Sequence, residues 1–342
     1  MGMSENLSRV DGPCIRVALV TALLIAACSA PDPRRDTSMT QGKSNATIIS
    51  PSAVALRNVT TVALRGPRDL VENSAAVMSR RQAGIWFTVN DSGNEPLLFA
   101  LDTLGANRGV WRVLDAANVD WEAASIGSCG TTGAGAAASC IYIGDVGDNN
   151  GRHPAGELYR VVEPDAIETG SAGTVGGLKA ELLRFRYADR PHDVEAMYVA
   201  PNGDVVLITK RELRDQNGEL RQALVFRVPA SAWGQARPAV AALVDSLPIV
   251  PSSVPFRLIT DASLAPDAKH LAVRTYGEVY VFATDSLTGA VLHDVKPTVC
   301  DVTPLSEYQG EGVAFVAPRS GRLLFTSEGR RSPMHLGDCA LP

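Results

Sequence analysis

The chain repeats one short segment, and this repetition limits the folds open to it more than any other feature. Residues 120–126 (DWEAASI) are closely matched by residues 193–199 (DVEAMYV) and 309–316 (QGEGVAFV). Weaker copies are residues 72–77 (ENSAAV) and 260–265 (TDASLA). Each copy has a small polar or acidic residue where an inward-facing strand would begin, and these residues recur every 48 to 73 positions. Such repeats are typical of a radial array of β-sheets, the β-propeller.

Each copy is followed by short β-branched or aromatic runs between clusters of Gly, Asp, Asn and Pro, which is the pattern of strands and turns. In order, these runs are residues 85–89, 97–101 and 109–114; 141–143, 158–161 and 182–186; 205–208, 224–228 and 241–244; 271–274, 279–282 and 291–292; and 312–316, 323–326 and 334–336. The predicted fold is all-β, a five-bladed propeller of four-stranded blades. Because the last blade lacks an outer strand, we expect residues 59–64 to supply it and close the ring. A sixth, irregular blade in the long third repeat is the alternative.

The N-terminus has the features of an export signal. Two arginines, Arg9 and Arg16, precede an apolar run at residues 17–27 that is too short to span a bilayer. We therefore predict a signal peptide over residues 1–27. Its ending, Ile-Ala-Ala-Cys, resembles the lipobox of bacterial lipoproteins, which implies that Cys28 carries lipid such as palmitate. An ordinary signal peptide with an incidental cysteine is the alternative.

These features predict where the protein works and how it is divided. We expect a bacterial envelope protein, outside the cytoplasm and held to a membrane by the lipid on Cys28; Ser29 favours the outer membrane. Residues 28–57 are rich in polar residues and read as a flexible tether, and residues 58–342 form the propeller domain. The net charge of -5 gives no reason to expect nucleic acid as a partner.

The cysteines agree with an oxidising compartment. Of the six, Cys14 leaves with the signal and Cys28 is lipidated, so four remain to form disulfides. Among three possible pairings we favour Cys129–Cys140, which would close a Gly/Ala-rich excursion, and Cys300–Cys339, which would hold the C-terminal strand. No CxxC spacing suggests zinc.

The repeated polar residues predict a metal site. In a propeller the innermost strands line a central channel, so equivalent positions of all the repeats meet there. Converging carboxylates repel one another, and a hard cation relieves that repulsion. Oxygen-only ligands favour calcium as the cofactor. The alternative is that each side chain merely bonds to backbone groups. The predicted ligands are Ser74, Glu122, Glu195, Ser263 and Glu311.

This order of residues resembles the calcium-activated nucleotidase (apyrase) family, whose five-bladed propeller holds a central calcium with one residue per blade. Residues 90–93 (NDSG) resemble that family's Asp-Asp-Arg-Thr-Gly loop, but Asn90 replaces the first Asp and Ser92 the Arg. The chain is also similar to uncharacterised bacterial secreted proteins with NDSG and GDxGDN loops. The family likeness implies phosphate-ester or anhydride chemistry, and the altered loop argues against it.

Loops at one end of the channel should gather charged side chains into a rim. Such a rim would suit an anionic small molecule that bridges a metal and a guanidinium group. The favoured function is a calcium-binding envelope module that binds a ligand or an envelope protein; the alternative is a calcium-dependent hydrolase resembling apyrases or phytases. Whether the protein is an enzyme stays open at this point. The candidate catalytic residues are Asp91, Asp145, Asp148, Arg211, Arg274 and Arg330.

Overall fold

The computed structural model describes residues 53–342 except residues 131–137, 154, 168–173, 212 and 254–255. The predicted signal peptide, the lipidation at Cys28 and most of the predicted tether lie outside these residues. Within the described part no helix is long and apolar enough to cross a membrane. Its helical turns are η1 (Ala230–Ala232) and η2 (Thr303–Leu305).

We divide the strands around the axis into five antiparallel four-stranded groups, units 1 to 5; units 2 and 3 are parts of one eight-stranded sheet, and β1 and β10 extend two of the others. Units 1 to 4 run outward along the chain from their inner strand, whereas the outer strand of unit 5 comes from the N-terminal segment. The strands are, in unit 1, β3 (Val77–Met78), β4 (Ile85–Val89), β5 (Leu97–Asp102) and β6 (Asn107–Leu114); in unit 2, β7 (Trp121–Ser128), β8 (Ser139–Asp145), β9 (Ala155–Val162) and β11 (Glu181–Tyr187); in unit 3, β12 (Val194–Val199), β13 (Val205–Thr209), β16 (Ala223–Val228) and β17 (Ala239–Leu247); in unit 4, β18 (Ile259–Leu264), β19 (His270–Thr275), β20 (Glu278–Ala283) and β21 (Thr298–Asp301); and in unit 5, β22 (Gly310–Phe315), β23 (Arg322–Ser327), β24 (Met334–Asp338) and β2 (Arg57–Val62).

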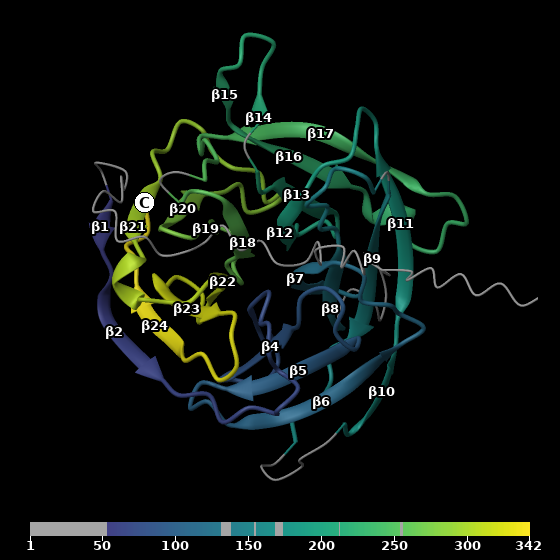
Figure 1. Ribbon diagram of the computed structural model, residues 1–342, viewed down its shortest axis with the longest axis vertical. Helices are drawn as coiled ribbons and strands as arrows, with labels where there is room; N and C mark the ends of the chain where they lie inside the picture. Colours follow the sequence, from purple (N-terminus) through teal and green to yellow (C-terminus); the bar gives the residue numbers. More distant parts are fainter. Residues whose placement is uncertain (1–52, 131–137, 154, 168–173, 212, 254–255) are drawn as a thin grey trace, which may run out of the picture. The chain divides into compact units, whose positions relative to one another are not determined.

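The units stand around a common axis, with β7, β12, β18 and β22 near the centre and β2, β6, β11 and β17 at the perimeter (Figure 1). Apolar side chains fill each boundary between neighbouring units. Phe87 and Trp121 belong to the cluster between units 1 and 2, and Trp86 and Leu324 to the one between units 5 and 1. Three more clusters join units 2 and 3, 3 and 4, and 4 and 5. The apolar core is therefore a closed ring of inter-sheet layers, and the predicted β-propeller is confirmed.

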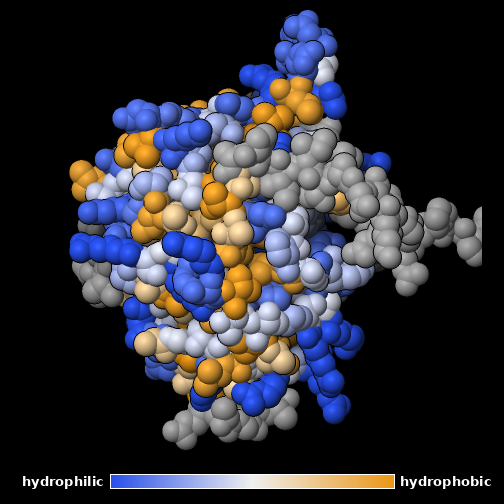
Figure 2. All heavy atoms as spheres, turned by 90° about the vertical axis from the view of Figure 1, so that its left-hand side faces the viewer, coloured by the Kyte–Doolittle hydropathy of each residue, from blue (hydrophilic) through white to orange (hydrophobic). Residues whose placement is uncertain are grey.

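The N-terminal strand closes the ring as predicted. Strand β2 pairs antiparallel with β24, and β1 (Val54–Ala55) just before it pairs parallel with β21, so one segment joins units 4 and 5. This pairing begins a few residues before the expected domain boundary at residue 58. Figure 2 faces this closure, where exposed apolar side chains include Val54 and Val59. Both predicted disulfides, Cys129–Cys140 and Cys300–Cys339, are present.

One predicted strand is wrong. Residues 291–292 do not form the outer strand of unit 4, because Asp285 accepts hydrogen bonds from the backbone of Leu287 and Thr288 and folds this stretch into a turn. Val291 makes only an isolated bridge to Thr284. The outer strand is β21, which starts directly after Pro297.

Additional pairings at the perimeter were not predicted. Strand β10 (Gly176–Lys179) adds parallel to β6, and β11 pairs parallel with β17, which joins the outer edges of units 2 and 3. The third repeat is long because it carries the hairpin β14 (Leu213–Arg214) and β15 (Leu220–Arg221) between β13 and β16. This hairpin projects from the perimeter at the top of Figure 1.

Candidate cation site

Four of the inner strands, β7, β12, β18 and β22, have a β-bulge at their start. The register shifts between Trp121 and Ala123 in β7, and between Val194 and Ala196 in β12. A shift at the same place occurs in β18 and β22. A bulge leaves one residue unpaired and re-aims its side chain. The residues at this position are Glu122, Glu195, Thr260 and Glu311.

Four of the five residues predicted as metal ligands are brought together. Glu122, Glu195 and Glu311 are buried, with exposed fractions of 6%, 2% and 3%. Burial raises the pKa of both Glu122 and Glu311, and the charge of Glu195 is the next largest cause in each case. The Ser74 hydroxyl donates a 3.1 Å hydrogen bond to Oε2 of Glu122.

The fifth residue, Ser263, lies elsewhere. The register of β18 puts Thr260 at the bulge position and Ser263 three residues further along. The Ser263 hydroxyl accepts a 3.2 Å hydrogen bond from the backbone N–H of Phe315. Ser125 in unit 2 does the same for Val199, also at 3.2 Å. Ser263 is therefore the counterpart of Ser125, and its hydroxyl joins two inner strands outside the acidic group.

The third repeat neutralises its acidic pair with its own cations. Lys210, directly after β13, donates a hydrogen bond to Oε1 of Glu195, and Arg211 donates one to Oδ2 of Asp193. The other oxygen of Asp193 accepts the backbone N–H of Asp148 at 2.9 Å. This Asp-x-Glu pair thus has an ammonium and a guanidinium group as partners.

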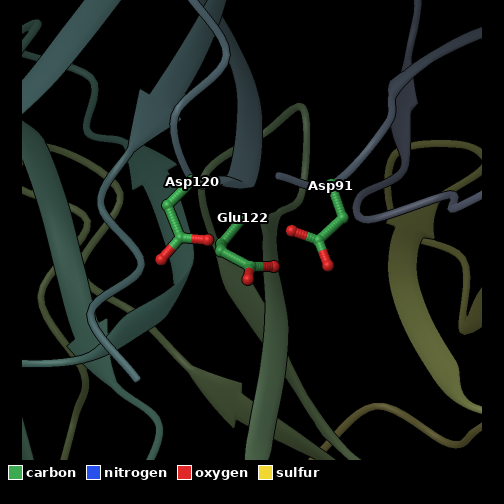
Figure 3. A group of neighbouring side chains, drawn as sticks. All are labelled: Asp91, Asp120 and Glu122. Carbon is green, nitrogen blue, oxygen red and sulfur yellow. The ribbon is translucent and has the colours of Figure 1, made fainter. Parts of the chain in front are cut away.

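The second repeat has the same pair without such partners. Ligand oxygens of Asp120, Glu122 and the neighbouring Asp91 all lie within 4.8 Å of one another. The three carboxylates turn toward a common space (Figure 3). No lysine or arginine of the described residues forms a hydrogen bond or ion pair with them. Asn118 holds the loops in place, because its amide donates to the backbone oxygens of Asn90 and Asp91 and accepts the N–H of Trp121.

Residues after β8 explain the difference. The backbone N–H of Val146 donates to Asp120 O at 3.2 Å, as that of Lys210 donates to Asp193 O at 3.0 Å. Val146 and Gly147 therefore occupy the places of Lys210 and Arg211. A Cβ atom at Gly147 would lie 2.5 Å from Oδ2 of Asp120 and 2.7 Å from Cγ of Glu122. Gly147 therefore packs directly against the two carboxylates and leaves no room for a side chain, so the second repeat has no basic group where the third repeat places two cations.

The uncompensated carboxylates have altered acidity. Burial, followed by the charges of Asp91, Asp193 and Asp145, raises the pKa of Asp120 to about 7. Burial, with Asp91 and Glu72 next, also raises that of Glu328 to about 7. Gln309 links Glu328 to the ring glutamate Glu311, because its amide donates to Glu311 at 2.8 Å and to Glu328 at 2.7 Å. A divalent cation held by carboxylate oxygens would favour their ionised forms.

The predicted catalytic rim is largely occupied by structural contacts. Arg274 is completely buried and donates to the backbone oxygens of Gly312 and Thr326, at 2.7 Å and 2.9 Å, and to Glu307, so its placement at the rim was wrong. Asp145 accepts the N–H groups of Val119 and Asp120.

Other rim candidates are placed in different surroundings. Asp148 accepts the N–H groups of Arg152 and His153, and Arg211 pairs with Asp193. Arg330 is exposed after β23. Asp91 alone among the six candidates belongs to the three-carboxylate group.

The sequence carried a signal for the residues that were missed. Asp120 and Asp193 each stand two positions before a ring glutamate, and this repeated Asp-x-Glu pattern marks both pairs. Thr260 could not be identified, because the weak fourth copy aligns equally well three residues further along, with Ser263 in that position. The burial of Lys210 among glutamates had no signal in the sequence.

Known proteins resemble this chain in fold but not in sequence. No protein-family model matches it, and no curated protein matches its sequence. Solved structures that it resembles include a luciferin-regenerating enzyme, at 12% identity and a TM-score of 0.39, covering 78% of this chain and 77% of that one. Another is an inactive virginiamycin B lyase from Staphylococcus aureus, at 5% identity, a TM-score of 0.37 and coverages of 82% and 99%.

A third similar structure is the PQQ domain of pyranose dehydrogenase from Coprinopsis cinerea. Its identity is 10% and its TM-score 0.37, with 84% of this chain and 99% of that chain covered. Similarities of this size carry no information on substrate or reaction.

Proposed function

We propose that this protein is an envelope module that binds a calcium ion through Asp91, Asp120 and Glu122. The observation that carries the proposal is the contrast between two equivalent acidic pairs. Asp193 and Glu195 have Arg211 and Lys210 as partners, whereas Asp120 and Glu122 meet Asp91 and have no basic partner among the described residues. A cation from solution would do for the second repeat what the two basic side chains do for the third.

The chemistry of the donors favours calcium. All three candidate ligands are carboxylates, and hard cations prefer such oxygens over the nitrogen and sulfur ligands that zinc takes. Glu122 is anchored by Ser74 and by its place in a bulge, while Asp91 and Asp120 come from loops. A site that combines rigid and adjustable ligands suits calcium better than magnesium, which demands a strict octahedron.

Binding rather than hydrolysis is the favoured role. A phosphate substrate would need basic side chains at the rim, but Arg274 lies in the interior and Arg211 is engaged by Asp193. We propose that the half-exposed site holds calcium for an envelope ligand or protein, with the predicted lipid on Cys28 keeping the module at the membrane. Calcium-dependent phosphate release from nucleotides or phytate would instead support the hydrolase.

Calorimetric titration of the purified, chelator-treated protein with calcium tests the proposal. We expect binding that raises the melting temperature, and Asp120→Asn should weaken it by about tenfold or more, since even groups one shell out from a metal have effects of this size. Asp193→Asn is the matched control, because Asp193 has the same place in the next repeat; its calcium affinity should fall far less than that of Asp120→Asn, because Asp193 acts on the site only through its charge. Absent binding, or equal weakening in both variants, would refute the proposed site.

A further inference from the structure

The centre of the channel contains a lysine where the sequence suggested a metal. Lys210 is 7% exposed, and its side chain donates a hydrogen bond to Glu195. Its ammonium nitrogen lies 5.7 Å from the centre of the Tyr276 ring. The Tyr276 hydroxyl in turn donates a 3.4 Å hydrogen bond to Glu311. Lys210 therefore sits in a polar group drawn from units 3, 4 and 5.

The position of Lys210 is fixed by its backbone. Its N–H donates to Asp193 O at 3.0 Å, and its carbonyl accepts the N–H of Ile259 at 3.3 Å. These bonds tie Lys210 to the residues that begin the second Asp-x-Glu pair and strand β18. Two main-chain hydrogen bonds, one within unit 3 and one to unit 4, therefore fix the backbone from which the Lys210 side chain extends toward the ring glutamates.

The charge of Lys210 acts on all three ring glutamates. Burial alone would lower its pKa, but Glu195, Tyr276, Glu311 and Glu122 together raise it well above the ordinary value. In return, Lys210 opposes the effect of burial on Glu122, Glu195 and Glu311. A lysine held by several carboxylates stays charged.

We propose that the ammonium group of Lys210 is the axial cation of this propeller and excludes a metal ion from the space between Glu195 and Glu311. One further observation agrees with this. Thr260 takes the place that a fourth glutamate would occupy, and its hydroxyl donates to Glu311 O at 3.0 Å.

This inference extends the proposed function, because it confines the calcium ion to the side of Asp91, Asp120 and Glu122. It predicts that the carboxylates nearest Lys210 are not calcium ligands. Glu195→Gln and Glu311→Gln should bind calcium as the wild type does, whereas Glu122→Gln should not. Loss of calcium binding in Glu195→Gln would overturn the inference.

Removing the lysine tests the inference even if the wild type binds no calcium. In chelator, Lys210→Met should melt about 10 °C below wild type, because a buried charge group loses its counterion. Glu195→Gln in the Lys210→Met background should recover much of that shift. Calcium should also bind Lys210→Met at an added site and raise its melting temperature, and this gain should disappear in the double variant.

The outcomes separate the two proposals. Equal melting temperatures for wild type and Lys210→Met in chelator would show that the ammonium group does not neutralise the ring. If Lys210→Met does not fold in chelator, the double variant and refolding with calcium provide the same test; failure of both to restore structure would also overturn the inference. Absence of calcium binding in wild type alone would refute the proposed function and leave the axial role of Lys210 standing.

Discussion

The second and third repeats place the same Asp-x-Glu pair at the start of an inner strand, yet the two pairs have opposite surroundings. Asp193 and Glu195 contact Arg211 and Lys210. Asp120 and Glu122 instead meet a third carboxylate, Asp91, beside a glycine. The backbone hydrogen bonds around both pairs correspond closely, so the contrast lies in the side chains alone.

The contrast shows two ways in which one fold can balance buried carboxylates. A built-in ammonium group makes the balance permanent and independent of solution conditions. An open acidic group depends on protons or on a cation taken from solution, and such a dependence can be used for binding. The same register position is thus structural in one repeat and a candidate binding site in the next.

Transferring the lysine should abolish the contrast and gives the largest expected effect. Val146 is the backbone counterpart of Lys210: its carbonyl accepts Val194 N–H at 3.4 Å, as that of Lys210 accepts Ile259 N–H at 3.3 Å. Val146→Lys should give Glu122 its own ammonium partner. The stabilisation by calcium, about 2.7 kcal/mol at a hundred times the dissociation constant, should then vanish from thermal melts.

Its control is Val162→Lys, which adds the same charge at an exposed position on β9. This variant should keep the full calcium effect. If Val146→Lys binds calcium as tightly as wild type, the two pairs are not equivalent in the way proposed.

The next largest expected effect is on the pH dependence of folding stability, which should differ between the two acidic pairs. In the folded protein burial and neighbouring carboxylates raise the pKa of Asp120 from 3.8 to about 7. The folded state therefore holds a proton that the unfolded chain releases, and stability falls as the pH rises from about 4 to 7. Asp120→Asn removes this loss.

Urea unfolding in chelator should consequently show Asp120→Asn gaining about 1 kcal/mol on wild type between pH 5 and pH 8, after allowance for solvent screening at a half-exposed site. With saturating calcium the wild type should lose this slope, because the metal favours the ionised carboxylate. A constant difference between the two proteins across this range would contradict the assignment of Asp120.

The repeat itself was enough to predict the ring, because residues 120–126 and 193–199 share both polarity and strand pattern. Closure by the N-terminal strand followed from one missing strand, and both disulfides followed from the position of cysteines near strand ends. Residues 291–292 misled because Val-Leu satisfies the strand pattern, while Asp285 and the turn it caps override it.

The site was harder to predict from the sequence than the fold, because its geometry depends on a bulge and on side chains from other units. A shift of three residues in the alignment decides whether Thr260 or Ser263 is expected at the bulge position, and the weak fourth copy does not encode that choice. The sequence also does not show which side chain neutralises a given carboxylate. Lys210 and Val146 occupy equivalent positions, but this equivalence follows only from the backbone hydrogen bonds of the folded structure.

The smallest expected effects come from two serines that the sequence treats alike. The Ser74 hydroxyl donates to Glu122, so Ser74→Ala should weaken calcium binding several-fold, the equivalent of about 1 kcal/mol for one lost hydrogen bond. Ser263→Ala should cost a similar amount of folding stability, because Phe315 N–H loses its acceptor, but should leave calcium affinity unchanged. Calorimetry and urea unfolding on both variants distinguish these results. Equal weakening of calcium binding would place Ser263 at the site after all and restore the five-residue ring.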